Sequence, residues 1–133
     1  MPPLEVLIVD DNPGDLRLIE ECVRSSHSPL NVSLSTDGEA ALQFLDRTQP
    51  DLILLDLKLP KLDGHEVLKR MKVHNFQKPV VVIMSSSRNP DDIDRAFEAG
   101  ASDYMPKPSD LEDFRKAVDT VLRTWIDPIL RSK

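Results

Sequence analysis

The chain has 133 residues and a formal net charge of −6 at pH 7, which suits a single domain with one hydrophobic core and leaves no room for a second. An excess of carboxylates repels nucleic-acid phosphates, so we expect no direct binding of nucleic acid. The single cysteine, Cys22, excludes an internal disulfide and is expected to pack on a helix, and no apolar run is long enough to cross a membrane, so we expect a cytoplasmic protein.

Apolar runs alternate with amphipathic stretches five times along the chain, which predicts an α/β fold with a parallel sheet and crossover helices. The expected strands, in chain order, are 4–9, 31–35, 52–55, 80–84 and 103–105. The expected helices begin near residues 12, 36, 65, 91 and 109. The strand over 52–55 is apolar at every position, which is typical of a strand covered on both faces, and we expect it to be the central one.

Several residues mark the ends of these helices. Asn12-Pro13 favours a helix start, because Asn caps helices and Pro fits the first turn. Gly100 is the expected C-cap of the fourth helix. Ser109 and Glu112 have the spacing of a capping box, which predicts that the last helix begins near Ser109.

The last helix has more apolar positions than one sheet face requires. Its core stripe is expected to consist of Leu111, Phe114, Val118, Val121 and Trp125. Further apolar residues reach Leu130, and either a buried carboxyl-terminal helix or a dimer interface would explain them. Pro128 is expected to end or kink the helix. We therefore expect one domain over 1–133, with a core of about 4–125 and a short helical extension over 126–133.

Two surface features are also apparent. Basic residues outnumber acidic ones between Leu57 and Lys78, and a solvated helix face explains this better than a docking patch. The three histidines, His27, His65 and His74, share no metal-ligand spacing and have no cysteine partners, so all three are expected on the exposed surface.

Polar residues follow three of the expected strands. Asp10-Asp11 and Asp56 come directly after the first and third, and Ser85 follows the fourth. Carboxyl ends of parallel strands meet at one edge of an open sheet, so these side chains should converge there. A dense carboxylate cluster needs a cation, and Mg²⁺ prefers such oxygen ligands. Lys107 would neutralise a phosphoryl oxygen, and the Ser85 hydroxyl would donate to another.

The chain resembles the response-regulator receiver domains of two-component signalling over nearly its whole length. The matching segments are Val9-Asp10-Asp11-Asn12, the stretch from Leu55 to Gly64, the stretch from Ala99 to Tyr104, and Lys107-Pro108. The resemblance implies a doubly wound, flavodoxin-like fold with five helices and a five-stranded parallel sheet in the order 2-1-3-4-5.

The resemblance also implies the roles of the site residues. Asp56 would accept the phosphoryl group, Asp10 and Asp11 would hold Mg²⁺ together with Asp56, and the Lys58 carbonyl would supply another ligand. Phosphorylation would convert one carboxylate into an acyl phosphate, which hydrolysis would later reset. The protein would then catalyse only its own modification and would not be an enzyme for other substrates.

Three further residues complete the implied switch. Ser85 and Lys107 would move toward the new phosphoryl group, and Tyr104 would swing inward. A cis peptide is implied at Lys107-Pro108. Two departures from the family are Ser85, where Thr is commoner, and Pro106, which stiffens the approach to Lys107.

The leading functional hypothesis is a stand-alone response regulator, phosphorylated by a sensor histidine kinase and read out by protein contacts. Asn12-Pro13 and the apolar stretch from Trp125 to Leu130 are similar to small regulators of bacterial phytochrome kinases, some of which form homodimers through the face with the last helix. One alternative is a phosphorelay shuttle that passes its phosphoryl group to a histidine phosphotransfer protein. A remote alternative is a haloacid-dehalogenase-type phosphatase, whose nucleophile is followed two positions later by Asp, whereas Lys58 stands there in this chain.

Overall fold

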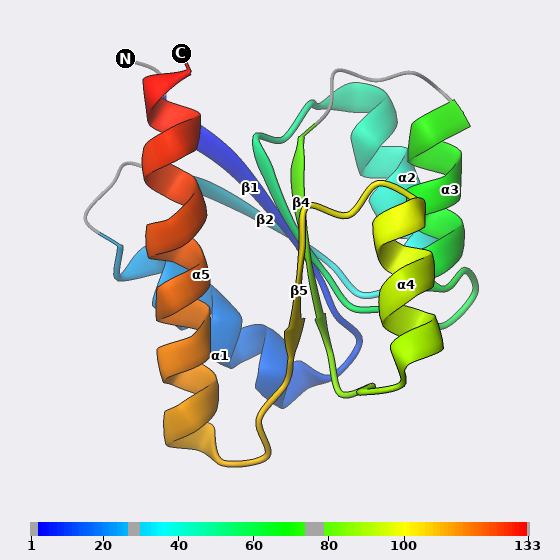
Figure 1. The fold of residues 1–133 in the computed structure, drawn as a ribbon. Helices are drawn as coiled ribbons and strands as arrows, with labels where there is room; N and C mark the ends of the chain where they lie inside the picture. The colour runs from blue at the N-terminus through cyan, green and yellow to red at the C-terminus, as the bar shows by residue number, and fades with distance from the viewer. Residues whose placement is uncertain (1–2, 27–29, 74–78, 133) are drawn as a thin grey trace.

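The computed structural model describes residues 3–26, 30–73 and 79–132. Within them, five parallel strands form one sheet in the order β2-β1-β3-β4-β5 (Figure 1), which confirms the expected topology. The strands are β1 (Leu4–Val9), β2 (Leu30–Ser35), β3 (Leu52–Leu55), β4 (Val80–Ser85) and β5 (Asp103–Pro106). The helices are α1 (Pro13–Arg24), α2 (Gly38–Arg47), α3 (Gly64–Val73), α4 (Pro90–Glu98) and α5 (Leu111–Arg131).

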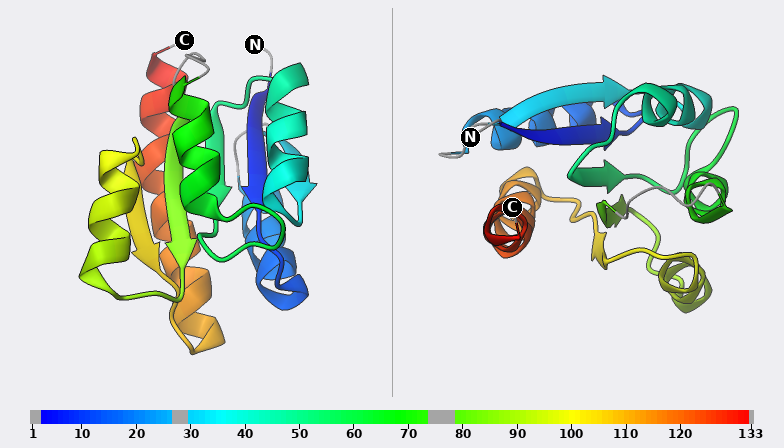
Figure 2. Two further views of the ribbon diagram at one scale, coloured as in Figure 1. Left: turned by 90° about the vertical axis from the view of Figure 1, so that its right-hand side faces the viewer. Right: turned by 90° about the horizontal axis from the view of Figure 1, so that it is seen from above.

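The helices cover both faces of the sheet. Helices α1 and α5 lie on one face, and α2, α3 and α4 lie on the other (Figures 1 and 2). Each face has its own cluster of buried apolar side chains, and β3 contributes Leu52 and Leu54 to one and Ile53 and Leu55 to the other. All four residues of this strand are buried, which confirms that the apolar run at 52–55 is the central strand.

Short-range hydrogen bonds set the helix ends. The Asn12 side chain caps α1 by accepting from the backbone N–H of Asp15 at 3.0 Å, as the sequence predicts. Gly100 has a φ of 110° and follows the C-cap residue of α4, so it provides the left-handed turn that ends this helix. The prediction for α5 is wrong by one residue. Its cap is Asp110, whose carboxylate, rather than the Ser109 hydroxyl, accepts from the Asp113 N–H at 3.0 Å.

The sequence predicts that Pro128 ends or kinks the last helix; α5 continues through Pro128 to Arg131, so Pro128 does not end it. Ile126 and Ile129 are buried in the core that α5 shares with α1. Proline within a helix costs about 3 kcal/mol. Each buried aliphatic side chain stabilises by roughly 1.5–3 kcal/mol, which offsets that cost. The two isoleucines thus pack within their own chain.

None of the helices in the described part of the chain is long and apolar enough to cross a membrane.

Candidate functional site

Three aspartates converge at the carboxyl edge of the sheet. Asp10 follows β1 and Asp56 follows β3, and one carboxylate oxygen from each of Asp10, Asp11 and Asp56 lies within 4.8 Å of the other two. Asp10 is 1% exposed and Asp56 is 7% exposed, whereas Asp11 faces solvent. Parallel strands thus bring together acids that lie about fifty residues apart in the chain, as expected from their positions after apolar runs.

A buried lysine lies beside these carboxylates. The ammonium group of Lys107, which follows β5, donates to Asp10 Oδ2 at 2.7 Å and to Asp56 Oδ2 at 2.9 Å. It also donates to Asp15 Oδ2 at 3.0 Å. These contacts use all three N–H donors of the ammonium group.

Asp15 is a site residue that the sequence analysis missed. It lies in the first turn of α1, which begins directly after the Asp10-Asp11 pair. The predicted helix start at Asn12-Pro13 was the available signal, because it places the first turn of this helix at the same edge of the sheet.

Burial and charge shift the pKa values of two site residues. Burial raises the pKa of Asp10 from 3.8 to about 6, and the hydrogen bond from Lys107 only partly opposes this. Burial favours the neutral amine of Lys107, but its hydrogen bonds to Asp10 and Asp56 outweigh that effect and hold its pKa above the usual value. The lysine is therefore a permanent cation at neutral pH, and it only partly balances the surrounding carboxylates.

The donor set fits a hard divalent cation. Asp10, Asp11 and Asp56 offer carboxylate oxygens, which Mg²⁺ prefers, and the exposed side of Asp11 leaves room for the waters that such an ion retains. Lys58 lies two residues beyond Asp56 in an exposed loop, and its backbone N–H donates to Asp56 Oδ1 at 3.2 Å.

The loop after β3 lies close against the Asp56 backbone. The Gly64 N–H donates to the Leu57 carbonyl at 2.8 Å, and a Cβ atom on Gly64 would collide with the Asp56 carbonyl oxygen. Glycine at position 64 therefore allows α3 to begin in close contact with the backbone of the candidate phosphoacceptor.

Ser85 and Tyr104 are linked through the loop after β4. Ser85 is fully buried. It is the last residue of β4, whereas the sequence predicts that it lies just beyond the strand. Its Oγ accepts from the Ser87 N–H at 3.2 Å, and its carbonyl accepts from the Lys107 N–H at 2.7 Å. The half-buried Tyr104 donates its hydroxyl hydrogen to the Ser87 carbonyl at 2.7 Å. Ser87 thus contacts both Ser85 and Tyr104, two of the implied switch residues.

The expected cis peptide at Lys107-Pro108 is wrong, because every peptide bond in the described ranges is trans. The trans form of an X-Pro bond is intrinsically favoured by about 0.5–1 kcal/mol. Lys107 makes its three carboxylate contacts with the bond in this form.

The expectation of exposed histidines is wrong for His65, whose side chain is only 12% exposed. It lies at the start of α3, on the side that packs toward α4, so its ring is enclosed even though its neighbours Lys69 and Lys72 are exposed. His27 and His74 lie outside the described residues. The described basic residues of the 57–78 segment are exposed, as expected of a solvated face: Lys58, Lys61, Lys69, Arg70 and Lys72.

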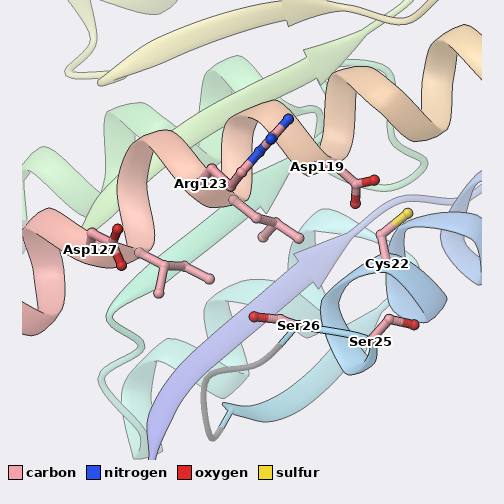
Figure 3. A pocket seen from close by; sticks show the side chains of 8 residues that line it. Cys22, Ser25, Ser26, Asp119, Arg123 and Asp127 are labelled. Carbon is pink, nitrogen blue, oxygen red and sulfur yellow. The ribbon is translucent and has the colours of Figure 1, made fainter.

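A separate hollow of about 490 Å³ lies between α1 and α5 (Figure 3). Cys22 points into it from α1, and Asp119 and Arg123 line it from α5. Cys22 is buried, as expected, and burial raises the pKa of its thiol. This hollow is formed by the second half of α1, away from the carboxylates that follow the strands.

Comparison with known proteins agrees with this geometry. Residues 6–119 match the family model of the response regulator receiver domain. The chain is 35% identical to response regulator Rcp1 of Synechocystis sp., over 96% of this chain and 92% of Rcp1.

Two solved structures are also similar. The phosphorylated cyanobacterial phytochrome response regulator RcpA has a TM-score of 0.89 and 34% identity, over 94% of this chain and 95% of RcpA. The Mn²⁺-bound form of Rcp1 has a TM-score of 0.88 and 34% identity, over 92% of this chain and 94% of that one. The chain therefore belongs to the response-regulator receiver family.

Proposed function

We propose that the chain is a response regulator that a sensor histidine kinase phosphorylates on Asp56, and that it signals through protein contacts. The observation that carries this proposal is the contact of Lys107 with Asp56 and Asp10 beside a third, exposed carboxylate. This arrangement brings the proposed carboxylate nucleophile, a fixed cation and the proposed metal ligands to a single edge of the sheet.

The proposed reaction needs no general base, because the nucleophile is an ionised carboxylate. A carboxylate oxygen of Asp56 forms a bond to the phosphorus of a phosphohistidine, and the P–N bond breaks. Its electron pair stays on the imidazole nitrogen, which takes a proton from water. The ammonium of Lys107 donates to a phosphoryl oxygen and balances its charge.

The proposed metal ligands are the carboxylates of Asp10, Asp11 and Asp56 and the carbonyl of Lys58. A Mg²⁺ ion bound there supplies positive charge to the phosphoryl oxygens. The chain's own residues position Asp56. Its carboxylate accepts from the Lys58 N–H on one oxygen and from Lys107 on the other, which fixes its orientation.

The proposed switch uses Ser85 and Tyr104. The Ser85 hydroxyl donates to the phosphoryl group, and Tyr104 reports the change through the loop that carries Ser87. Both residues form hydrogen bonds with Ser87, so a movement of one side chain is coupled to a movement of the other.

The proposed partner is a phytochrome-type sensor kinase, because the similar protein RcpA is a phytochrome response regulator. We also propose a cytoplasmic location and no binding of nucleic acid, in keeping with the net charge of −6. A homodimer through the face with α5 would use exposed side chains such as Leu111, because Ile126 and Ile129 are buried within the chain. Light scattering in both phosphorylation states would test it, and a monomer in both would exclude it.

Receiver-family membership favours this function over the haloacid-dehalogenase alternative. The shuttle alternative uses the same site and differs only in the fate of the phosphoryl group. Rapid transfer of label from the phosphorylated protein to a histidine phosphotransfer protein would favour the shuttle.

The proposal is tested by incubating the protein with MgCl₂ and a small acyl phosphate, followed by intact-mass spectrometry. We expect a gain of one phosphoryl group that requires Mg²⁺ and disappears in Asp56→Asn. Asp46→Asn, an exposed carboxylate on α2, is the control and should retain the gain. Phosphorylation that persists in Asp56→Asn would refute the assignment.

A further inference from the structure

His65 is a largely buried side chain whose two ring nitrogens are unsatisfied. Its Nδ1 and Nε2 are both shielded from solvent, and neither has a hydrogen-bond partner among the described residues. Most buried polar groups in folded proteins are hydrogen-bonded, so such a group calls for an explanation. An apolar side chain of similar size would occupy this place at lower cost.

The Asp92 carboxylate, in the first turn of α4, lies close to the His65 ring. Asp92 Oδ1 lies 3.5 Å from His65 Nε2, which is longer than a well-formed hydrogen bond. The other oxygen, Asp92 Oδ2, accepts from the Ser87 hydroxyl at 2.6 Å. This hydrogen bond and the neighbouring imidazole lower the pKa of Asp92, so its carboxylate stays ionised at neutral pH.

Ser87 connects this pair to the candidate switch. Its N–H donates to Ser85 Oγ, its carbonyl accepts from the Tyr104 hydroxyl, and its own hydroxyl donates to Asp92. The same Ser87 hydroxyl oxygen accepts from the Asn89 N–H at 3.3 Å. The position of Ser87 therefore depends on Asp92 on one side and sets the surroundings of Ser85 on the other.

We propose that His65 is a positioning residue for phosphorylation, acting through Asp92 and Ser87 to hold the loop after β4 and the Ser85 hydroxyl at its end. His65 touches neither Asp56 nor a reacting atom, and its effect is carried by the loop. The inference rests on the proposed function, because it concerns the same phosphorylation site.

The unsatisfied ring makes this role separable from a purely structural one. Replacing His65 by Leu removes two buried nitrogens and retains an apolar side chain in the same place. The free energy of unfolding should then stay the same or rise. If the histidine positions the loop, the same variant should react more slowly, so stability and reactivity would change in opposite directions.

The test compares His65→Leu and Asp92→Ala in the full chain. We expect each to lower the phosphorylation rate at saturating acyl phosphate and Mg²⁺ by roughly three- to tenfold, because a misplaced group near the reacting centre slows the reaction. The double variant should be no slower than either single one, since both break the same contact. His65→Gln, which retains a nitrogen donor, should recover much of the rate.

Two matched controls accompany these variants. Lys69→Ala alters an exposed side chain on α3, and Asp91→Ala removes the neighbouring acid from the first turn of α4. Both should keep the unmodified rate. Amide hydrogen exchange supplies a readout that needs no phosphorylation. The Ser87 and Asn89 amides should exchange faster in His65→Leu and in Asp92→Ala, but not in the two controls.

An unmodified rate together with unmodified exchange in His65→Leu would overturn the inference, as would additive losses in the double variant. A rate loss matched by Lys69→Ala and Asp91→Ala would also overturn it. If the unsubstituted protein gains no phosphoryl group, the proposed function fails, and the exchange of the Ser87 amide still decides whether His65 holds the loop.

Discussion

Lys107 Nζ donates a hydrogen bond to Asp15 Oδ2 at 3.0 Å, which joins the first turn of α1 to the lysine at the end of β5. Asp15 is the most exposed of the three carboxylates around this ammonium group. Metal binding would draw on Asp10, and phosphorylation would alter Asp56, but neither step changes Asp15. It is therefore the one acceptor that stays available to Lys107 throughout the proposed reaction.

Asp15→Asn should weaken Mg²⁺ binding. Asparagine keeps an oxygen that accepts from Lys107 but removes one negative charge from the site. The interaction of a partly exposed carboxylate with a nearby charge is worth on the order of 0.5–1 kcal/mol, so its loss corresponds to a roughly two- to fivefold weaker affinity for Mg²⁺. Titration of the protein with Mg²⁺ in a calorimeter measures this affinity. Glu39→Gln, which removes an acid from the first turn of α2, is the control and should leave the affinity unchanged.

Lys107→Met should destabilise the metal-free protein by about 3–5 kcal/mol, because it leaves Asp10 and Asp56 buried without their cation. Addition of Mg²⁺ should restore part of this loss, since the ion supplies the missing positive charge. Urea unfolding with and without MgCl₂ measures both effects, and the exposed Lys116→Met serves as the control. Equal stability of Lys107→Met and the unmodified protein without metal would contradict the assigned charge balance.

Asp10 should make the metal-free protein less stable as the pH rises. Its pKa is about 6 in the folded protein, against 3.8 for an ordinary aspartate, so the folded state holds the proton more tightly. The stabilisation from this proton is complete below pH 3.8 and is lost as the pH rises through 6. Asp10→Asn removes this dependence, so its stability relative to the unmodified protein should increase between pH 5 and about pH 7.

Urea unfolding in EDTA at these two pH values gives the difference between Asp10→Asn and the unmodified protein. The comparison cancels the titration of other groups, provided that they are the same in both proteins. A difference that does not change with pH would show that burial does not raise the Asp10 pKa.

Gly64→Ala should lower both stability and phosphorylation. The new Cβ would meet the Asp56 carbonyl oxygen and force the loop after β3 to shift, at a cost of roughly 1–3 kcal/mol. Gly14→Ala is the matched control. It lies in the first turn of α1, its Cβ would come no closer than 3.4 Å to Asn12 Oδ1, and alanine favours helix. Thermal unfolding should rank Gly64→Ala well below Gly14→Ala, and the reverse order would refute the steric argument.

Much of the fold could be predicted from local patterns. The apolar run at 52–55 identified the central strand because a strand covered on both faces has no polar side. Asn12-Pro13 identified a helix start because capping depends on residues within one turn. The same locality explains the small error at α5, where Asp110 and Ser109 are adjacent and both can cap.

The dense carboxylate site could also be anticipated, because parallel strands end at one edge and each acid follows a strand. The contacts of Lys107 with Asp15 and of His65 with Asp92 could not. Each joins side chains from different layers or different helices, and no spacing in the chain encodes how two helices face each other.

By itself, the sequence determined which polar residues stand at the ends of which strands, because hydrophobic periodicity and capping act over a few residues. The tertiary structure alone decided which partners those residues take. Packing of α1 and α5 against one face brought Asp15 to Lys107 and buried Ile126 and Ile129. Packing of α3 beside α4 enclosed His65, because burial depends on the neighbouring helix as well as on the residue's own.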